Sequence, residues 1–558
     1  MIVVFSVLID KIILYMENEE IINKWKLALT EDKQSVKKLS KLNGLSDNNP
    51  FFSRLFFDSK KIIARLGIGY GKLNKLVINQ IAFSFSQILK RRASDKEPID
   101  VLVSSDGAPE LKDFLKNISN VFFAQNLTVT AFKSYAGYDI KFVCRTINKL
   151  KISAGIYIER SIYNNNVFSV FFIDHNGNYF GEDFIEEMKK EIAKHDIFEI
   201  ESQPAKVDFL SNHKVVNDYV QKLLSLSNRK GDQRKMKIAI SNYNHGVTDI
   251  LQKILGNMDF NYIINNKINE GNIHQKKHRN DKTFTKFYRK DISFSKENKC
   301  DMLICPSKNG TELNLFVFNG RQVFYLDANE ITLMFLNFFL IEVNISTKKL
   351  PNSYIGTDIS PIQSIKNLIK KYDLELSVSE DIVVHNDKFL LFYWNQNSQF
   401  IFGENKIIEF GFYHLMIKFL EMINYYKTQR LTIPSLRNVL AKMYGSFKTH
   451  IIILNFEINK IYLLLEKINQ SELNFKFPIE STVMFDHSNV LNENLIAKIL
   501  LKNGTELFIK FNYLNKKILI FIRLEDTHNK IWNKDGIMRN TFIKSLHATI
   551  KKDLKHIS

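Results

Sequence analysis

The feature that most constrains the fold is an alternation of short apolar runs with helical stretches in the first half of the chain. Apolar runs at 101–103, 127–132 and 154–158 are separated by stretches of helical periodicity at 110–125 and 140–150. Short apolar runs favour buried strands, and the helical stretches are long enough to connect parallel strands. The pattern therefore predicts an α/β domain, and later alternations predict further units of this class.

The length of 558 residues, with 45% apolar content, is enough for several hydrophobic cores. We expect three α/β domains with mixed sheets between helices, followed by a smaller α+β domain. A polar, basic segment, LSNRKGDQRK at 226–235, is typical of a linker. The predicted divisions are an N-terminal extension or misassigned start at 1–17, and domains at 18–226, 227–340, 341–450 and 451–558.

The net charge of +19 could indicate a polyanionic partner such as nucleic acid or anionic lipid. Lys, Asn, Ile and Phe are abundant, Pro occurs only 9 times, and the lysines are scattered. This composition is typical of a protein from a very AT-rich genome. We therefore favour a solvated basic surface over a nucleic-acid groove.

The three cysteines, Cys144, Cys300 and Cys305, lie in or beside apolar segments. Their positions predict small buried side chains in a reducing compartment, without disulfides or a zinc site. The apolar N-terminus is interrupted by Asp10 and Lys11 and is too short to span a bilayer. We expect a cytoplasmic protein.

One stretch, SAGIYIERSIYNNNVFSVFFIDHNGNYF at 153–180, places a serine at the end of a predicted strand. The strand is predicted at 154–158 and a second one at 167–173, followed by a turn at Asn176 and Gly177. Strand ends in α/β sheets often carry reacting groups. Ser161 is therefore a candidate nucleophile, although the pattern alone does not set it apart from other serines.

Several landmarks follow one another in a fixed order along the chain: the glycine-containing loop FDSKKIIARLGIGYGKLN, the AGI of 154–156, the strand CDMLIC followed by PSKNGTEL, and the helix ending in MINYYK. This order resembles the phosphoglucomutase and phosphomannomutase family, the α-D-phosphohexomutases. The resemblance runs from about residue 18 over nearly the whole chain, and the framework carries it more than the catalytic residues do. It implies four domains around a central cleft.

The family's serine motif, TASHNP, aligns its phosphoryl-carrying serine with Ser161. The family's flanking His and Asn help to activate that serine, because a hydroxyl is a poor nucleophile until its proton is removed. The residues that replace the rest of the motif here are Glu159, Arg160, Ile162, Tyr163 and Asn164. In the first loop, Ile63 replaces an arginine of the family. In the next element, Ala108 replaces another arginine.

The family's metal loop, DPDADR, holds one Mg²⁺ with three aspartates, whose carboxylate oxygens suit this hard cation. The aligned positions here are Ser307, Asn309 and Thr311, and Glu312 replaces the arginine. The resemblance therefore implies that no metal is bound at this loop.

The sugar-recognition loop, GFEES in the family, aligns with 394–398, so that Gln396 and Asn397 replace both glutamates and Ser398 is retained. The phosphate clamp, RPSGTEP, aligns with 510–516 and retains one cation, Lys510. These four residues are the substrate-binding candidates. The two NGTE sequences, at 309–312 and 503–506, are predicted to be turns.

His274 and His278 have the spacing of a helical metal-binding pair, but Gln275 stands where a zincin has its catalytic glutamate. The surrounding stretch, KKHRNDKTFTKFYRK at 276–290, interleaves aromatic and basic residues and could bind single-stranded nucleic acid. We favour a solvated surface insertion over both alternatives.

These observations predict a degenerate phosphohexomutase that is inactive or weak and keeps a site for a sugar phosphate or a protein partner. The alternative is an active enzyme that moves phosphate between the 1 and 6 positions of glucose or mannose through Ser161, with Mg²⁺ as cofactor. A second alternative is a polyanion-binding protein. We expect no cofactor in the leading case, and neither a membrane nor a nucleic acid as partner.

Overall fold

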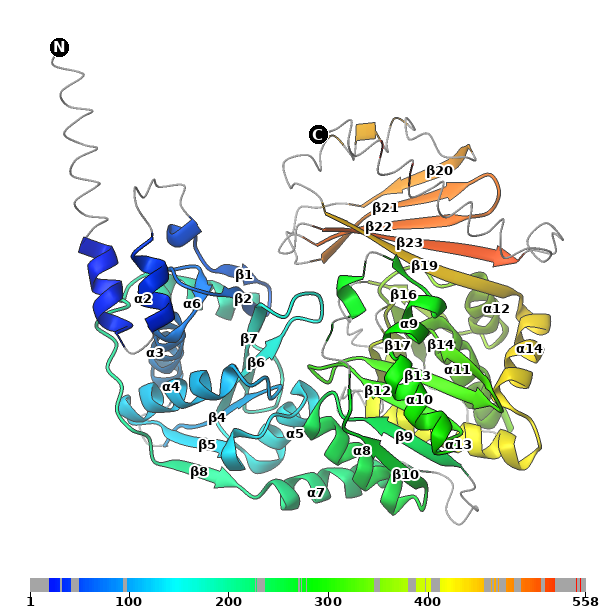
Figure 1. Ribbon diagram of the computed structural model, residues 1–558, viewed down its shortest axis with the longest axis horizontal. Coiled ribbons are helices and arrows are strands. Elements are labelled where there is room, and N and C mark those ends of the chain that lie inside the picture. The colour runs from blue at the N-terminus through cyan, green and yellow to red at the C-terminus, as the bar shows by residue number, and fades with distance from the viewer. Residues whose placement is uncertain are drawn as a thin grey trace. The chain divides into compact units, whose positions relative to one another are not determined.

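The computed structural model falls into two compact units. The first comprises Met1–Ser161 and Asn165–Val215, and the second comprises Ile162–Asn164 and Val216–Ser558. Figure 1 shows the elements of both. The structure describes residues 20–30, 33–41, 50–93, 98–225, 227, 236–268, 271, 273–276, 278–345, 352–379, 388–396, 398–402, 412–455, 463, 466–467, 470, 478–485, 493–512, 517–526, 548 and 552.

The first unit is built on an eight-stranded mixed sheet with the order β1-β2-β7-β6-β4-β5-β8, to which β3 adds beside β2. β4 runs parallel to β5 and β6, whereas β7 runs antiparallel to β6 and β2. The strands are β1 (Phe56–Asp58), β2 (Lys61–Leu66), β3 (Lys72–Leu73), β4 (Asp100–Ser105), β5 (Thr128–Phe132), β6 (Ala154–Arg160), β7 (Val167–Asp174) and β8 (Val207–Leu210).

Amphipathic helices supply the other half of this core. Val77, Ile81 and Phe85 of α3 are buried together with Val103 and Ile156 of the sheet. The helical elements are α2 (Lys33–Leu39), η1 (Pro50–Phe52), α3 (Lys75–Arg92), α4 (Leu111–Ala124), η2 (Lys133–Tyr135), α5 (Ile140–Leu150), α6 (Glu182–Ile192) and α7 (Asn212–Leu224), the last of which crosses the boundary between the units.

The glycine-containing loop before α3 is held by Asn74. Its side-chain oxygen accepts hydrogen bonds from the backbone N–H groups of Leu76 and Val77, which caps the helix. Its amide nitrogen donates to the carbonyl oxygens of Gly67, Gly69 and Lys72. Gly69 has φ +119°, and a Cβ there would lie 2.5 Å from a backbone oxygen. Gly69 and Asn74 therefore have a structural role in this loop.

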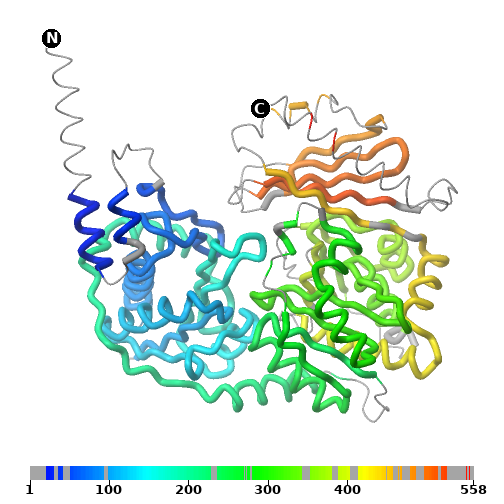
Figure 2. Tube along the Cα trace, in the orientation of Figure 1, coloured from blue at the N-terminus to red at the C-terminus, as the bar shows by residue number. Residues whose placement is uncertain are grey.

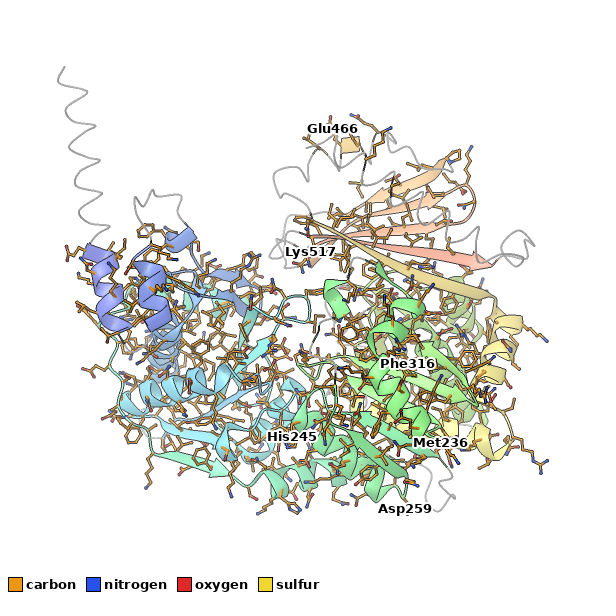
Figure 3. The ribbon with its side chains drawn as sticks, in the orientation of Figure 1. Met236, His245, Asp259, Phe316, Glu466 and Lys517 are labelled. Atoms are coloured by element: carbon orange, nitrogen blue, oxygen red, sulfur yellow. The ribbon has the colours of Figure 1, made fainter. Side chains whose placement is uncertain are left out.

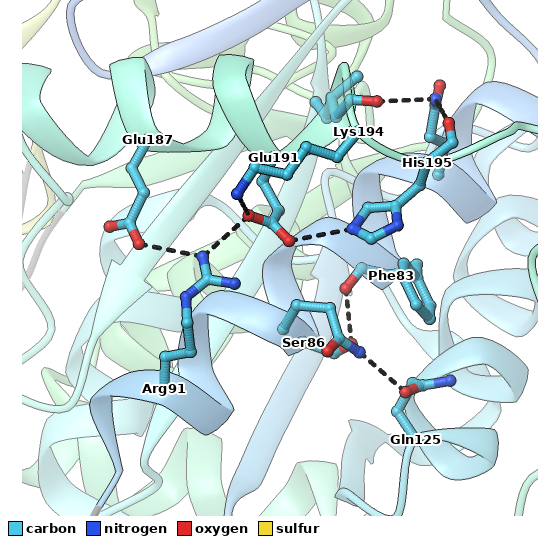
Figure 4. A network of polar contacts seen from close by, with 11 residues as sticks. Phe83, Ser86, Arg91, Gln125, Glu187, Glu191, Lys194 and His195 are labelled. Atoms are coloured by element: carbon cyan, nitrogen blue, oxygen red, sulfur yellow. Dashed lines mark hydrogen bonds and ion pairs between the residues drawn. The ribbon is translucent and has the colours of Figure 1, made fainter.

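A charged network joins α3 to α6 in the first unit (Figure 4). Arg91 donates to Glu187 and Glu191 at 3.2 and 3.0 Å, and the ring of His195 lies 3.0 Å from Glu191. Burial raises the pKa of Glu191, but hydrogen bonds from Arg91, His195 and Lys194 outweigh that effect and lower the pKa to about 2. Glu191 is therefore held as a carboxylate between the two helices.

The second unit contains three sheets. The first is five-stranded, with the order β10-β9-β12-β13-β14, and is mixed because β9 runs parallel to β10 and β12 while β13 is antiparallel. Its strands are β9 (Lys237–Ser241), β10 (Asn261–Asn265), β12 (Met302–Pro306), β13 (Leu313–Asn319) and β14 (Gln322–Leu326). The accompanying helices are α8 (His245–Asn257), η3 (Ile273–Gln275), α9 (Asp281–Phe287), α10 (Arg289–Glu297) and α11 (Ala328–Ile345).

The second sheet is four-stranded, with the order β16-β15-β17-β18. Its strands are β15 (Ser353–Thr357), β16 (Glu375–Val378), β17 (Phe389–Trp394) and β18 (Phe400–Phe402), and the neighbouring helices are α12 (Gln363–Lys371), α13 (Phe412–Thr428) and α14 (Ile433–Tyr444). β15 pairs in parallel with β16 and β17, as the prediction of an α/β unit requires.

The third sheet is antiparallel throughout and six-stranded, with the order β11-β19-β23-β22-β21-β20. Its strands are β11 (His278–Arg279), β19 (Ser446–Asn455), β20 (Ile479–Met484), β21 (Glu493–Leu501), β22 (Glu506–Asn512) and β23 (Lys517–Asp526). The tube in Figure 2 traces the long strands β19 and β23 of this sheet.

The prediction of a solvated surface insertion at 276–290 is wrong. Phe284, Phe287 and Tyr288 are buried in one core with Phe316 of β13, the residue labelled in Figure 3. His274 and Arg279 are also buried, and β11 adds an edge to the third sheet by pairing with β19. The basic composition hid this burial, since the aromatic residues anchor the segment while Lys276, Lys282, Lys286 and Lys290 are exposed. With these rings buried, they are not available to stack on bases.

Several local predictions are confirmed. β6 and β7 include the strands predicted around Ser161, and Gly177 adopts φ +79° in the predicted turn. Gly310 and Gly504, in the two NGTE sequences, also have positive φ and lie in turns. All three cysteines are buried and unbonded. Among the described helices, none has the length and apolarity that crossing a membrane requires.

Some predictions fall outside the described residues. These are the N-terminal extension at 1–17, Asn397, and the linker at 226–235 apart from Ser227. The division into four domains at 18–226, 227–340, 341–450 and 451–558 stays a prediction.

Candidate functional site

Ser161 lies directly after β6, at the end of a strand that the backbone holds firmly. Its N–H donates to the carbonyl oxygen of Val167 at 2.8 Å, so that the loop between β6 and β7 closes on itself. The preceding Arg160 forms an ion pair with Glu110 at 2.7 Å. Ser161 is half-buried at the predicted strand end.

Two carboxyl groups flank the start of this loop. Asp106 accepts hydrogen bonds from the N–H groups of Arg160 and Ala108 at 2.7 and 2.9 Å. The bond from Arg160 connects the end of β4 to the serine loop, the segment at 161–166 between β6 and β7. Burial raises the pKa of Asp106 to about 6, against the lowering effect of these two bonds. Burial also raises the pKa of Glu159 to about 8, and the ammonium of Lys61 only partly offsets it. Asp106 therefore positions the loop backbone.

The loop aligned with the family's metal site, 307–312, is closed by its own hydrogen bonds. Asn309 Oδ1 accepts from Ser307 Oγ at 2.7 Å and from Thr311 Oγ1 at 3.0 Å. Ser307 Oγ accepts from the N–H of Glu312 at 2.9 Å. The three side chains satisfy one another, and they are neutral. They do not fit Mg²⁺, which requires oxygen ligands free to face the ion and favours carboxylates.

The side chain at the end of this loop has a different partner. Glu312 Oε2 lies 2.6 Å from His274 Nε2, and both side chains are buried. On the other side of the ring, Arg279 Nη1 contacts His274 Nδ1. Because a guanidinium nitrogen can only donate, Nδ1 is the acceptor and the ring proton lies on Nε2, facing Glu312. The chain Arg279–His274–Glu312 thus links the segment before α9 to the loop at 307–312.

The sugar-loop residues lie against the same loop. The N–H of Leu313 donates to the carbonyl oxygen of Ser398 at 3.0 Å, and Gln399 Nε2 donates to Thr311 Oγ1 at 3.3 Å. Gln396 exchanges side-chain hydrogen bonds with Asn329 of α11 at 3.1 and 3.4 Å. The structure therefore brings the predicted metal-loop and sugar-loop positions together within the second unit.

A pocket lies at this meeting point. Its lining includes His274, Arg279 and Glu312, together with Asn329, Gln396 and Ser398. Asp281 and Asp327 also face it. Burial, with Asp281 nearby, raises the pKa of Asp327 to about 6. The pocket combines one guanidinium group with several carboxyl and amide groups and with the apolar Phe284, Ala328 and Ile451, and convergent polar groups in a partly apolar pocket are typical of a small-molecule site.

Lys510, which the resemblance aligns with the family's phosphate clamp, is buried on β22. Its ammonium group lies 3.0 Å from the carboxylate of Asp358, which follows β15. The pair joins the second and third sheets of the second unit. The binding of a phosphate by Lys510 stays a prediction, and any such ligand would have to compete with Asp358.

Sequence reasoning missed Arg279 and gave His274 the wrong surroundings. Both belong to a run of basic residues that has the composition of a solvated loop. The signal that could have found them is the aromatic residues that follow, Phe284, Phe287 and Tyr288, which are too many for an exposed insertion. In the part of the chain that the structure describes, no group of three or more His, Cys, Asp or Glu side chains is arranged to hold a metal.

Comparison with known proteins rests on the fold. No protein-family model matches the chain, and no curated protein matches it in sequence. Parafusin, a phosphoglucomutase from Paramecium, superposes with a TM-score of 0.61 at 11% identity, over 86% of this chain and 92% of its own.

Two bacterial structures give similar values. A phosphoglucomutase/phosphomannomutase family protein from Burkholderia thailandensis has a TM-score of 0.58 at 12% identity, over 89% of this chain and 97% of its own. A Thermus thermophilus protein described as a phosphomannomutase has a TM-score of 0.60 at 10% identity, over 90% of this chain and 100% of its own. The match extends over nearly the whole of each chain, which confirms the resemblance at the level of the fold. This chain has the fold of the phosphoglucomutases and phosphomannomutases, the α-D-phosphohexomutases.

Proposed function

We propose that this protein has the phosphohexomutase fold without the mutase reaction, and that it acts by binding a ligand or partner. The observation that carries the proposal is the state of the loop at 307–312. Its neutral side chains hydrogen-bond to one another, and Glu312 is engaged by His274. Phosphoryl transfer of the family's kind needs a cation at this loop to neutralise the transferring group, and these residues supply none.

The serine loop supports the same conclusion. An apolar Ile162 follows Ser161 where the family has a histidine, and no side chain of the TASHNP motif other than the serine is retained. Without a group that removes the hydroxyl proton, serine attack on a phosphate is slow. On this proposal, Ser161 keeps its position at the strand end but lacks the neighbouring groups that would activate its hydroxyl.

A coupled assay tests the proposal. Purified protein is incubated with glucose 1-phosphate, glucose 1,6-bisphosphate and Mg²⁺, and glucose 6-phosphate is detected through its dehydrogenase, with mannose 1-phosphate tested in parallel. We expect no turnover above that of the Ser161→Ala variant. Turnover that disappears in Ser161→Ala would establish the active mutase instead.

A further inference from the structure

The pocket of the second unit contains two buried ionic side chains whose polar atoms are only partly satisfied. Arg279 is 2% exposed, and its Nε and Nη2 atoms have no hydrogen-bond partner among the described residues. Glu312 is 1% exposed, and its Oε1 atom has none in the same part of the structure. An unsatisfied buried charged group costs more than a neutral one, so it marks a place where a ligand can contribute.

The two groups are held in place from one side by the same residue. His274 engages one terminal nitrogen of Arg279 and one oxygen of Glu312. The opposite edge of the guanidinium, formed by Nε and Nη2, and the second carboxylate oxygen have no hydrogen-bond partner among the described residues, and both side chains line the pocket. This edge presents two parallel N–H donors, the geometry that binds a planar oxyanion with two hydrogen bonds.

The other charges of the pocket limit the kind of anion. Glu312, Asp281 and Asp327 all line it, so three carboxyl groups surround one guanidinium group. A doubly charged phosphate would be repelled by them more strongly than a singly charged, planar carboxylate. Glu312 Oε1 is an acceptor and needs a donor, which a hydroxyl group beside the carboxylate would supply. The amide pair of Asn329 and Gln396 offers further polar contacts.

We infer that this pocket binds a small hydroxycarboxylate, with its carboxylate on Arg279 Nε and Nη2 and its hydroxyl group donating to Glu312 Oε1. The inference goes beyond the proposed function, because it names a ligand class for a pocket built within the second unit. It does not depend on whether Ser161 carries a phosphoryl group.

A binding experiment with the full chain, in the absence of Mg²⁺, tests the inference. Binding is measured by isothermal titration calorimetry or by ligand-observed NMR. The probes are glycolate and L-lactate, with acetate as the partner that lacks the hydroxyl group and inorganic phosphate as the competing anion. We expect glycolate and lactate to bind, acetate to bind more weakly, and phosphate to bind more weakly than glycolate. Equal or tighter binding of phosphate would overturn the assignment to a carboxylate, and absence of glycolate and lactate binding would overturn the site.

Substitutions of Arg279 and Glu312 test whether the ligand binds in this pocket. Arg279→Lys keeps the charge but loses the paired donors, and we expect affinity for glycolate to fall about tenfold or more, since one well-placed charged contact is worth at least that factor. Glu312→Gln should remove the preference of glycolate over acetate. The exposed Arg321, in the turn between β13 and β14, provides the control variant Arg321→Lys, which should bind as the parent does. Unchanged binding in a folded Arg279→Lys protein would contradict the inference. If that variant does not fold, the glycolate-to-acetate ratio in Glu312→Gln decides the matter.

Discussion

The Nε2 atom of His274 lies 2.6 Å from the Oε2 atom of Glu312, and both side chains are buried. This contact joins a segment that the sequence marks as a surface loop to the position where the mutase family has an arginine beside the phosphate. A buried carboxylate is costly unless it is hydrogen-bonded, so this contact fixes the loop at 307–312 in one arrangement. The loop is thereby organised around a protein side chain.

Removal of the histidine should release this arrangement. In His274→Ala, the buried carboxylate of Glu312 loses its hydrogen-bond donor, and we expect a loss of stability of at least about 3 kcal/mol, because an unsatisfied charged group costs more than a neutral one. The variant His274→Gln keeps a side-chain donor for Glu312 and an acceptor for Arg279, so it should lose less stability than His274→Ala. Chemical denaturation monitored by circular dichroism measures the change. A His274→Ala variant as stable as the parent would show that the pair does not organise the loop.

The buried pair between Lys510 and Asp358 leads to a second prediction. Lys510→Met leaves the carboxylate of Asp358 buried without its 3.0 Å partner, so the transition of the second unit should be destabilised by about 3 to 5 kcal/mol. Lys510→Met combined with Asp358→Leu should be closer to the parent than either single change, which a double-mutant cycle would detect. Additive effects of the two substitutions would exclude a direct interaction. As a matched control, the exposed Lys502→Met should be nearly neutral.

The network around Glu191 predicts an acid sensitivity in the first unit. Since the pKa of Glu191 is lowered to about 2 in the folded protein, its contribution is fully present above the unfolded pKa near 4.5 and is lost as the pH falls toward 2. Glu191→Gln should cost about 1 to 3 kcal/mol at pH 7, allowing for the exposure of Arg91 and Lys194. It should also flatten the fall in stability between pH 4.5 and 2. The same pH profile in parent and variant would contradict this account.

The cysteines give a prediction about reactivity. Burial raises the pKa of Cys144 to about 12 and that of Cys300 to about 11, and it raises the pKa of Cys305 well above its usual range. The reactive thiolate is therefore scarce, and reagents have little access. Native protein treated with iodoacetamide at about pH 8 should gain no adduct by intact mass, whereas protein in guanidinium chloride should gain one for each of its three cysteines. Rapid alkylation of the native protein would refute the buried placement.

Much of the framework around Ser161 could be predicted from the sequence. The strands β6 and β7 and the turn at Gly177 follow from apolar runs bounded by turn residues, and these local signals decide local structure. The lack of carboxylates in the loop at 307–311 could also be read directly from the sequence. Local patterns were sufficient here because each element carries its own periodicity or turn chemistry.

The pocket could not be predicted in the same way. Arg279 and His274 are buried only because β11 pairs with β19, about 170 residues further along the chain, and because the aromatic residues after them pack against β13. Neither contact leaves a periodic signal in the segment itself. Long-range pairing therefore overrode a basic composition that indicates a solvated loop when it is considered alone.

The central claim is that the fold has kept the position of Ser161 without its chemistry, and phosphorylation of that residue is the measurement that tests it most directly. The purified protein is incubated with glucose 1,6-bisphosphate and Mg²⁺, and its intact mass is measured beside that of Ser161→Ala. We predict that neither protein gains the mass of a phosphoryl group. A stoichiometric phosphoryl adduct on the parent that is absent from Ser161→Ala would contradict the account.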